Sequence, residues 1–253
     1  MSTLGGMDPD EYVDAVRRDA AALLSAARAA DPAASITACP EWAPIDLVWH
    51  IGEVHRFWCT VVAERLAEPP ADWPPERPGT DAEVIAFAEE SASLLPAALA
   101  AADPADAVWT WSSQQDVAFV QRRMAQETAV HRVDSERAAG SDHRIDADLA
   151  ADGIDEFLTF FLPYAAKGAP PLGGSVHLHC TDAAGDVGGE WTVRPGPDAA
   201  LVVSRDHIKA DTALRGPAHD LLMVLWRRNG LDAVEVLGDA DLAAHFVART
   251  NND

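Results

Sequence analysis

The sequence predicts a helical bundle followed by an α+β domain. Over roughly the first 140 residues, apolar positions recur at helical spacing in four long stretches. Beyond about residue 170 the apolar repeat shortens to two, which is typical of strands. Long helices joined by loops pack as an antiparallel bundle, whereas strands mixed with helices indicate a sheet covered by helices. We therefore expect two domains, residues 1–145 and 146–253.

The four helical stretches are bounded by residues that interrupt helices. We expect these helices over residues 8–30, 45–66, 81–101 and 117–139. The first and second stop before Pro32 and Pro69, and the fourth stops before Gly140. Pro96 lies inside the third stretch, where it is expected to kink or shorten the helix.

The second half combines helical and alternating segments. Helices are expected over residues 147–161, 217–228 and 239–249, and strands over 175–181, 190–193, 200–204 and 208–214. In the first of these strands His177 and His179 share the face opposite the apolar side chains. The sequence does not identify an acidic residue or a further histidine that would lie beside them, so we interpret the pair as part of a polar sheet face.

Composition excludes several classes of protein. The 253 residues are 48% hydrophobic and 24% charged, as in globular proteins, and the formal net charge of −22 disfavours binding to nucleic acids or anionic membranes. No apolar run approaches the roughly 20 residues of a bilayer span, and the N-terminus lacks a secretory pattern, so we expect a cytoplasmic protein. Three widely spaced cysteines argue against a disulfide framework or a cysteine-rich zinc site.

Common catalytic motifs are missing from the chain. The sequence contains neither G-x-G-x-x-G nor G-x-x-x-x-G-K-[ST], and it lacks G-x-S-x-G and H-E-x-x-H as well. Any metal site must therefore be assembled from separate helices.

One set of side chains suits such a site. Glu127 and His131 lie four residues apart, so they share one face of the fourth helix, and His50 lies among apolar residues of the second. Taken separately, Glu127 and His131 could be an ordinary solvated pair, and His50 could be an ordinary buried histidine. Together they supply two imidazoles and one carboxylate, a set that suits catalytic zinc with a free position or non-haem Fe(II). His55, about 140° further round the helix, cannot share the direction of His50.

Several segments carry a resemblance to a known family. They are residues 39–42, 46–58, 127–134, 151–156 and 234–239. On these segments the chain resembles the mycothiol-dependent maleylpyruvate isomerase family. The resemblance implies a DinB-like bundle, a C-terminal domain similar to sterol carrier proteins, and zinc held by His50, Glu127 and His131.

The resemblance also points to an arginine. Arg228 matches the family's active-site arginine, although the adjacent Arg227 leaves the register open. From the residues alone, the two arginines either complement the dipole at the end of an apolar helix or form a fork that binds a substrate carboxylate.

The function implied is that of a zinc-dependent isomerase or S-transferase. It would use mycothiol as a thiol cosubstrate on a small electrophile, which we expect to bear a carboxylate, such as maleylpyruvate. Low lysine usage beside abundant arginine and alanine is compatible with the actinobacterial source that mycothiol implies. We expect a monomer or small homo-oligomer that binds small molecules.

Two alternatives remain open. One is a non-catalytic binding or regulatory protein that retains the metal-binding bundle. The other is a metal-dependent hydrolase that uses water on the same ion.

Overall fold

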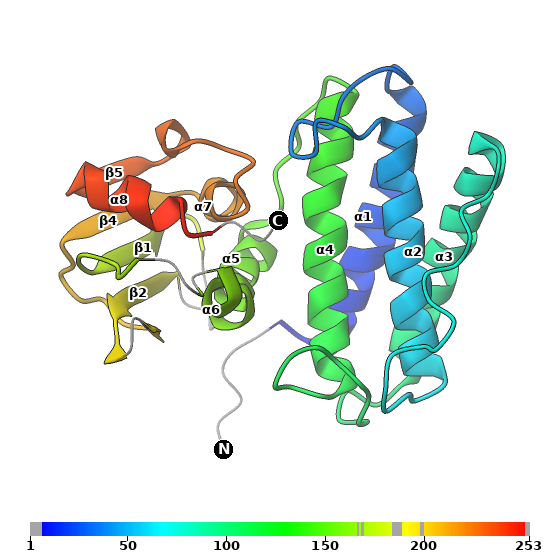
Figure 1. Ribbon diagram of the computed structural model, residues 1–253, viewed down its shortest axis with the longest axis horizontal. Helices are drawn as coiled ribbons and strands as arrows, with labels where there is room; N and C mark the ends of the chain where they lie inside the picture. The colour runs from blue at the N-terminus through cyan, green and yellow to red at the C-terminus, as the bar shows by residue number, and fades with distance from the viewer. Residues whose placement is uncertain (1–6, 166, 168–169, 184–188, 198–199, 251–253) are drawn as a thin grey trace. The chain divides into compact units, whose positions relative to one another are not determined.

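Two compact units make up the protein, one of residues 8–144 and one built on the residues from 145 onward. The computed structural model describes residues 7–165, 167, 170–183, 189–197 and 200–250 (Figure 1). Each unit has its own secondary structure and is described separately.

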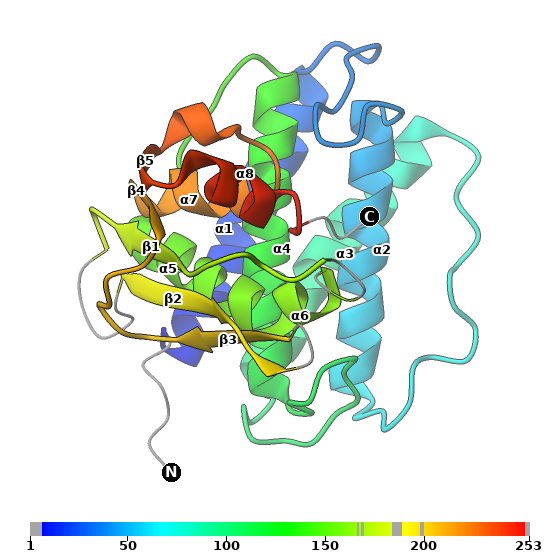
Figure 2. The same cartoon turned by 60° about the vertical axis from the view of Figure 1, so that its left-hand side comes forward.

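The first unit is a bundle of long helices. They are α1 (Pro9–Ala29), α2 (Pro44–Ala63), α3 (Asp81–Ala101) and α4 (Val117–Ala138). In both ribbon views α1, α2 and α4 run side by side, as expected for a bundle (Figures 1 and 2). Their apolar faces meet in a core that includes Leu23 of α1, Val48 and Ile51 of α2, and Val84 and Ala88 of α3.

Local chemistry explains where these helices begin. At α1 the Glu11 carboxylate accepts a hydrogen bond of 2.8 Å from the backbone of Asp8. The Thr80 hydroxyl caps α3 by accepting from the backbone of Glu83, and the Asp116 carboxylate caps α4 by accepting from Phe119. Each cap satisfies an amide group that the first turn of a helix leaves without a partner.

Pro96 does not shorten α3, which keeps the bounds expected from the sequence. The helix continues through Pro96 to Ala101, and Leu95, Pro96 and Leu99 are all buried. Tertiary packing therefore holds the last turn in spite of the hydrogen bond that proline cannot donate.

By length and composition alone, α3 is apolar enough to cross a membrane, with a mean hydropathy of 1.4 over its best window. Its contacts identify it instead as a helix of the bundle. Glu89 forms an ion pair with Arg28 of α1, and Glu90 lies 2.6 Å from Arg56 of α2.

The second unit combines helices with a mixed sheet. Its helices are α5 (Ala147–Glu156), α6 (Leu162–Ala165), α7 (Ala218–Leu225) and α8 (Ala240–Val247). Its strands are β1 (Val176–Cys180), β2 (Glu190–Pro195), β3 (Leu201–Ser204), β4 (Thr212–Gly216) and β5 (Glu235–Gly238). The strands form one sheet in the order β3-β2-β1-β4-β5 (Figure 2).

Strand pairing confirms the predicted hairpin of β1 and β2. These strands are antiparallel, with His177 opposite Thr192 and His179 opposite Glu190. The residues 184–188 that connect them lie outside the described residues. Strand β4 is parallel to β1, so the sheet is mixed.

Several details of the second unit differ from the sequence-based expectation. The segment expected over 147–161 is helical throughout, but α5 ends at Glu156 and residues Phe157–Phe161 form a π-helix whose two terminal rings stack 6.0 Å apart. Helix α7 ends at Leu225 instead of at 228. Strand β4 begins at Thr212 rather than at 208, and the carboxylate of Asp211, the residue before it, accepts hydrogen bonds from Ser175. Strand β5 was not predicted, since it is a short and mostly exposed edge strand without apolar alternation.

A buried ion-pair network joins α1 to α4 in the bundle. Arg132 of α4 lies 3.1 Å from Asp19 of α1 and 2.7 Å from Glu136, and it also donates to the carbonyl groups of His143 and Arg144. The side chains of Asp19 and Glu136 are each less than a tenth exposed. The network therefore satisfies charges that the bundle removes from water.

We expect Arg132→Leu to lower the free energy of unfolding by about 3 kcal/mol, because it leaves the buried Glu136 charge without its main partner. Chemical denaturation followed by circular dichroism measures the change. The matched control is Arg17→Leu, because the Arg17–Asp14 pair is exposed and should contribute about 1 kcal/mol or less. Equal losses in the two variants would contradict the role of the buried network.

Candidate metal centre

The bundle brings the three predicted metal ligands together. His50 extends from α2, and Glu127 and His131 extend from adjacent turns of α4. Nε2 of His50 lies 3.2 Å from Oε1 of Glu127, and Nε2 of His131 lies 3.3 Å from the same oxygen. One ligand atom from each residue lies within 4.8 Å of the others, so the three residues are close enough to hold one ion.

A second contact sets the register of α2 against α4. His55 is fully buried, and its Nε2 lies 2.9 Å from the hydroxyl of Thr128. Burial lowers the pKa of His55 to about 4, so this imidazole is neutral at pH 7. His55 is not part of the ligand cluster, in agreement with the direction expected from helical geometry.

Arg123 supports the carboxylate of Glu127. Its side chain is only 4% exposed, and its Nη2 lies 3.1 Å from Oε2, the oxygen that the histidines do not share. Burial by itself would raise the pKa of Glu127, but His131, His50 and Arg123 together hold this pKa well below its usual value. Glu127 is therefore ionised at neutral pH, with one oxygen held by arginine and the other directed at the imidazoles.

Asp134 supports His131 in the same way. Its carboxylate lies 2.9 Å from Nδ1 of His131, which directs Nε2 of that ring toward Glu127. Burial would lower the pKa of His131, but the negative charges of Glu127 and Asp134 raise it to about 9. A carboxylate behind a histidine is a common arrangement at metal sites, because it fixes the tautomer and makes the ligand more basic.

Three of these supporting residues were not predicted from the sequence. They are Arg123, Asp134 and Trp42, whose indole ring centre lies 5.1 Å from that of His50. Helical spacing offered a signal for two of them, since Arg123 precedes Glu127 by one turn and Asp134 follows His131 by one turn. For Trp42, which lies on the loop before α2, no spacing rule applies.

The donor set fits a divalent transition metal. Two neutral imidazoles and a carboxylate are ligands of catalytic zinc, and they leave a coordination position for a small molecule. The side chains of His50, Glu127 and His131 are 31%, 21% and 11% exposed, so solvent reaches the cluster. Chemically, the arrangement can bind a cation and present it to a ligand that arrives from solution.

The predicted arginine belongs to the second unit. Arg228 follows the end of α7, where it donates a hydrogen bond of 3.0 Å to the carbonyl of Trp226 and lies over the indole ring of that residue. Arg227 is exposed and has a positive φ of 58°, so the two arginines differ in conformation and surroundings.

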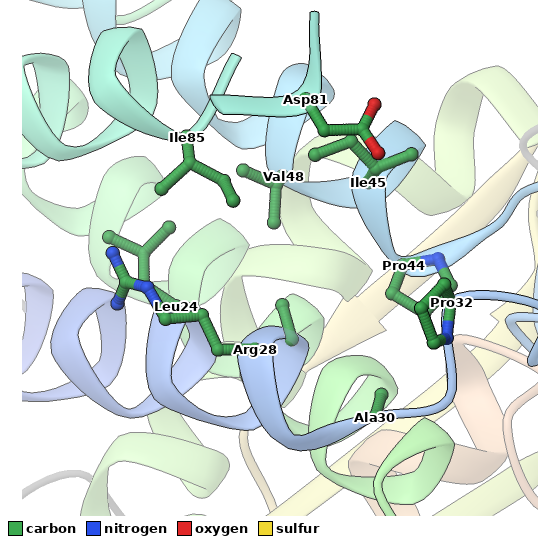
Figure 3. A pocket seen from close by; sticks show the side chains of 10 residues that line it. Leu24, Arg28, Ala30, Pro32, Pro44, Ile45, Val48, Asp81 and Ile85 are labelled. Carbon is green, nitrogen blue, oxygen red and sulfur yellow. The ribbon is translucent and has the colours of Figure 1, made fainter. Parts of the chain in front are cut away.

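A separate pocket of about 250 Å³ lies between α1, α2 and α3 (Figure 3). Leu24, Val48 and Ile85 project into it from the three helices. None of the three candidate ligands lines it, and its wall is mainly apolar. This pocket is therefore distinct from the cluster of His50, Glu127 and His131.

Comparison with known proteins agrees with these two units. The profile of the mycothiol maleylpyruvate isomerase N-terminal domain matches residues 8–136, and that of the MDMPI C-terminal domain matches residues 148–245. No curated protein matches the chain significantly.

Two solved structures share the fold. One is a crystal structure of the mycothiol-dependent maleylpyruvate isomerase, with 14% sequence identity and a TM-score of 0.59. The other is a mutant of that enzyme in which alanine replaces a histidine, with 13% identity and a TM-score of 0.60. Each match covers 93% of this chain and 95% of the other. Because the two family profiles extend over most of both units, the chain belongs to the mycothiol maleylpyruvate isomerase family.

Proposed function

We propose that the protein is a zinc-dependent enzyme that uses mycothiol to isomerise, or to transfer the thiol to, a small electrophile such as maleylpyruvate. The observation that carries this proposal is the convergence of two imidazole Nε2 atoms on one oxygen of Glu127. Residues His50, Glu127 and His131 would hold the metal, and the solvent-exposed side of the cluster would admit the thiol.

The charges around the cluster favour an anionic fourth ligand. The two imidazoles are neutral in the metal-binding form, so the three proposed ligands supply one negative charge, that of Glu127. A divalent cation held by them keeps an excess of positive charge at its open position. A thiolate neutralises that excess charge, whereas a neutral thiol or water does not.

When bound, zinc would lower the pKa of a coordinated thiol, so that the thiolate is present at neutral pH. Reversible addition of a thiolate to a double bond, followed by its elimination, permits rotation and so exchanges cis for trans. Burial raises the pKa of Cys59 and brings that of Cys180 to about 12, so these two thiols are poor sources of a thiolate at neutral pH.

The proposal also covers the fold families of the two units, the cellular location of the protein and the residue that binds a substrate carboxylate. We propose that the bundle is DinB-like, that the second unit is related to sterol carrier proteins, and that the protein acts in the cytoplasm. We also propose that Arg228 binds a carboxylate of the substrate, since a guanidinium forms paired hydrogen bonds with that group.

Removing a ligand should remove one equivalent of zinc. We expect His50→Ala and Glu127→Gln each to bind one zinc fewer per chain than the unaltered protein, because the two remaining donors cannot complete the site. Elemental analysis after dialysis measures the difference. His143→Ala is the matched control, since His143 also lies beside a carboxylate, 3.3 Å from Glu136, but outside the cluster. Unchanged zinc content in both site variants would contradict the assignment.

Zinc binding should release protons and weaken in acid. With a pKa of about 9, His131 is protonated in the metal-free protein at pH 7, and only its neutral form binds metal. We therefore expect affinity to rise by up to about tenfold per pH unit toward pH 9. Calorimetry in buffers of different ionisation enthalpy counts the protons released. The variant Asp134→Asn removes a negative charge that raises the pKa of His131, so zinc should release fewer protons from it at pH 8. An unchanged number of protons would contradict the link between zinc binding and the protonation of His131.

Activity should require the thiol. We expect thiol-dependent turnover with mycothiol and a panel of electrophiles that includes maleylpyruvate, and loss of that turnover in Glu127→Gln. Turnover without thiol would indicate metal-dependent hydrolysis instead, and no turnover by the zinc-loaded protein would indicate a binding protein.

The two adjacent arginines permit a matched test of carboxylate binding. We expect Arg228→Gln to raise KM for a carboxylate substrate by roughly tenfold or more, because a charged hydrogen-bonded pair is lost. Arg227→Gln should leave KM nearly unchanged. Steady-state kinetics measures both, and the reverse result would move the assignment to Arg227.

A further inference from the structure

A second cluster of metal-binding side chains lies in the second unit. It consists of His177 and His179 of β1, Glu190 of β2 and His207 of the loop between β3 and β4. One ligand atom from each of these four residues lies within 4.8 Å of the others. The sequence-based interpretation found no partner for the two strand histidines, and the structure supplies two.

Strand register explains how the first three residues meet. Side chains two apart on a strand share a face, which places His177 beside His179. Glu190 lies directly opposite His179 on the antiparallel neighbour, so its side chain joins the same face. The Glu190 Oε1 atom lies 2.8 Å from Nδ1 of His179.

A loop contact brings the fourth residue to this face. Thr192, which pairs with His177 across the hairpin, donates a hydrogen bond of 3.2 Å to the carbonyl of Asp206. This bond holds the loop against β2 one residue before His207. As a result, Nδ1 of His207 lies 2.5 Å from Oε2 of Glu190, and its ring centre lies 5.2 Å from that of His177.

His177 has an unused donor or acceptor at the centre of the cluster. Its side chain is only 9% exposed, and its Nε2 has no hydrogen-bond partner among the described residues. That nitrogen lies 3.6 Å from Oε2 of Glu190, too far for a hydrogen bond but within the cluster. An unpaired buried imidazole nitrogen is costly, and a metal ion at this position would satisfy it.

The cluster has the composition and charge of a transition-metal site. Three imidazole nitrogens and one carboxylate oxygen favour ions such as zinc, nickel or copper over magnesium or calcium. Ligand atoms on a tetrahedral zinc ion lie about 3.3 Å apart, so small side-chain shifts suffice. The register also places Arg215 of β4 beside His179, but Arg215 lies 3.0 Å from Glu235, which accounts for its charge.

We propose that His177, His179, Glu190 and His207 form a second site for a divalent transition metal, separate from the site in the bundle. Four protein ligands complete a tetrahedral zinc shell, which is typical of a structural rather than a catalytic site. The ion would join β1 and β2 to the loop that carries His207. Its role would be to stabilise the second unit.

Zinc titration of the full-length chain tests this proposal. The protein is stripped with a chelator and titrated with zinc against a chromophoric competitor, both unaltered and in a His50→Ala, Glu127→Gln background that removes the bundle ligands. We expect the background variant to bind one zinc and to unfold at a higher temperature when zinc is added. We expect Glu190→Gln or His179→Asn, added to this background, to weaken the binding by roughly 100-fold, since even supporting residues of a metal site contribute 10–100-fold.

Controls and a spectroscopic measurement separate this site from adventitious binding. His143→Asn is the matched control, because it removes a histidine beside a carboxylate outside both clusters and should leave zinc affinity unchanged. X-ray absorption of the zinc-loaded background variant should show three imidazole ligands. His207→Ala, which alters a ring with a 75% exposed side chain, provides a variant that should fold normally and still lose affinity.

Two results would overturn the second site. One is a background variant that binds no zinc, and the other is zinc binding that survives in Glu190→Gln, His179→Asn and His207→Ala. Neither depends on the bundle site or on enzymatic activity, so the proposed function and the second site can fail separately.

Discussion

The site in the bundle depends on keeping the carboxylate of Glu127 ionised while it is shared by two imidazoles. Burial opposes ionisation, and the structure counters it with Arg123 on one carboxylate oxygen and the two histidines on the other. The same oxygen links α2 to α4 through His50. The contact on which the proposed cation site depends therefore also contributes to the packing of the bundle helices.

Helix α4 carries most of this chemistry on regular spacing. Arg123, Glu127, His131 and Asp134 follow one another at intervals of four, four and three residues, so they form one stripe along the helix. Arg132 and Glu136 form a second polar pair that packs against Asp19 of α1. Helix α4 can lie in the core despite its charged sequence, because its buried charges occur in pairs.

The sequence predicts those features that depend on short-range periodicity. The four bundle helices follow from apolar repeats, and the proximity of Glu127 to His131 follows from one helical turn. Arg123 and Asp134 obey the same rule, because each lies one helical turn from a proposed ligand. The start of β4 and the exposed strand β5 depend instead on pairing with distant segments, which local patterns do not encode.

The histidine cluster of the sheet is a second feature that local sequence patterns predict only in part. The alternation of β1 places His177 and His179 on one face, but the partners come from a neighbouring strand and from a loop held by Thr192. The position of Glu190 depends on strand register, because a shift of one residue would turn its side chain to the opposite face.

The two clusters also differ in the number of potential metal ligands. Three proposed ligands in the bundle would leave a position for a small molecule, whereas four proposed ligands on the sheet would leave none in a tetrahedral shell, which favours catalysis at the first and stabilisation at the second.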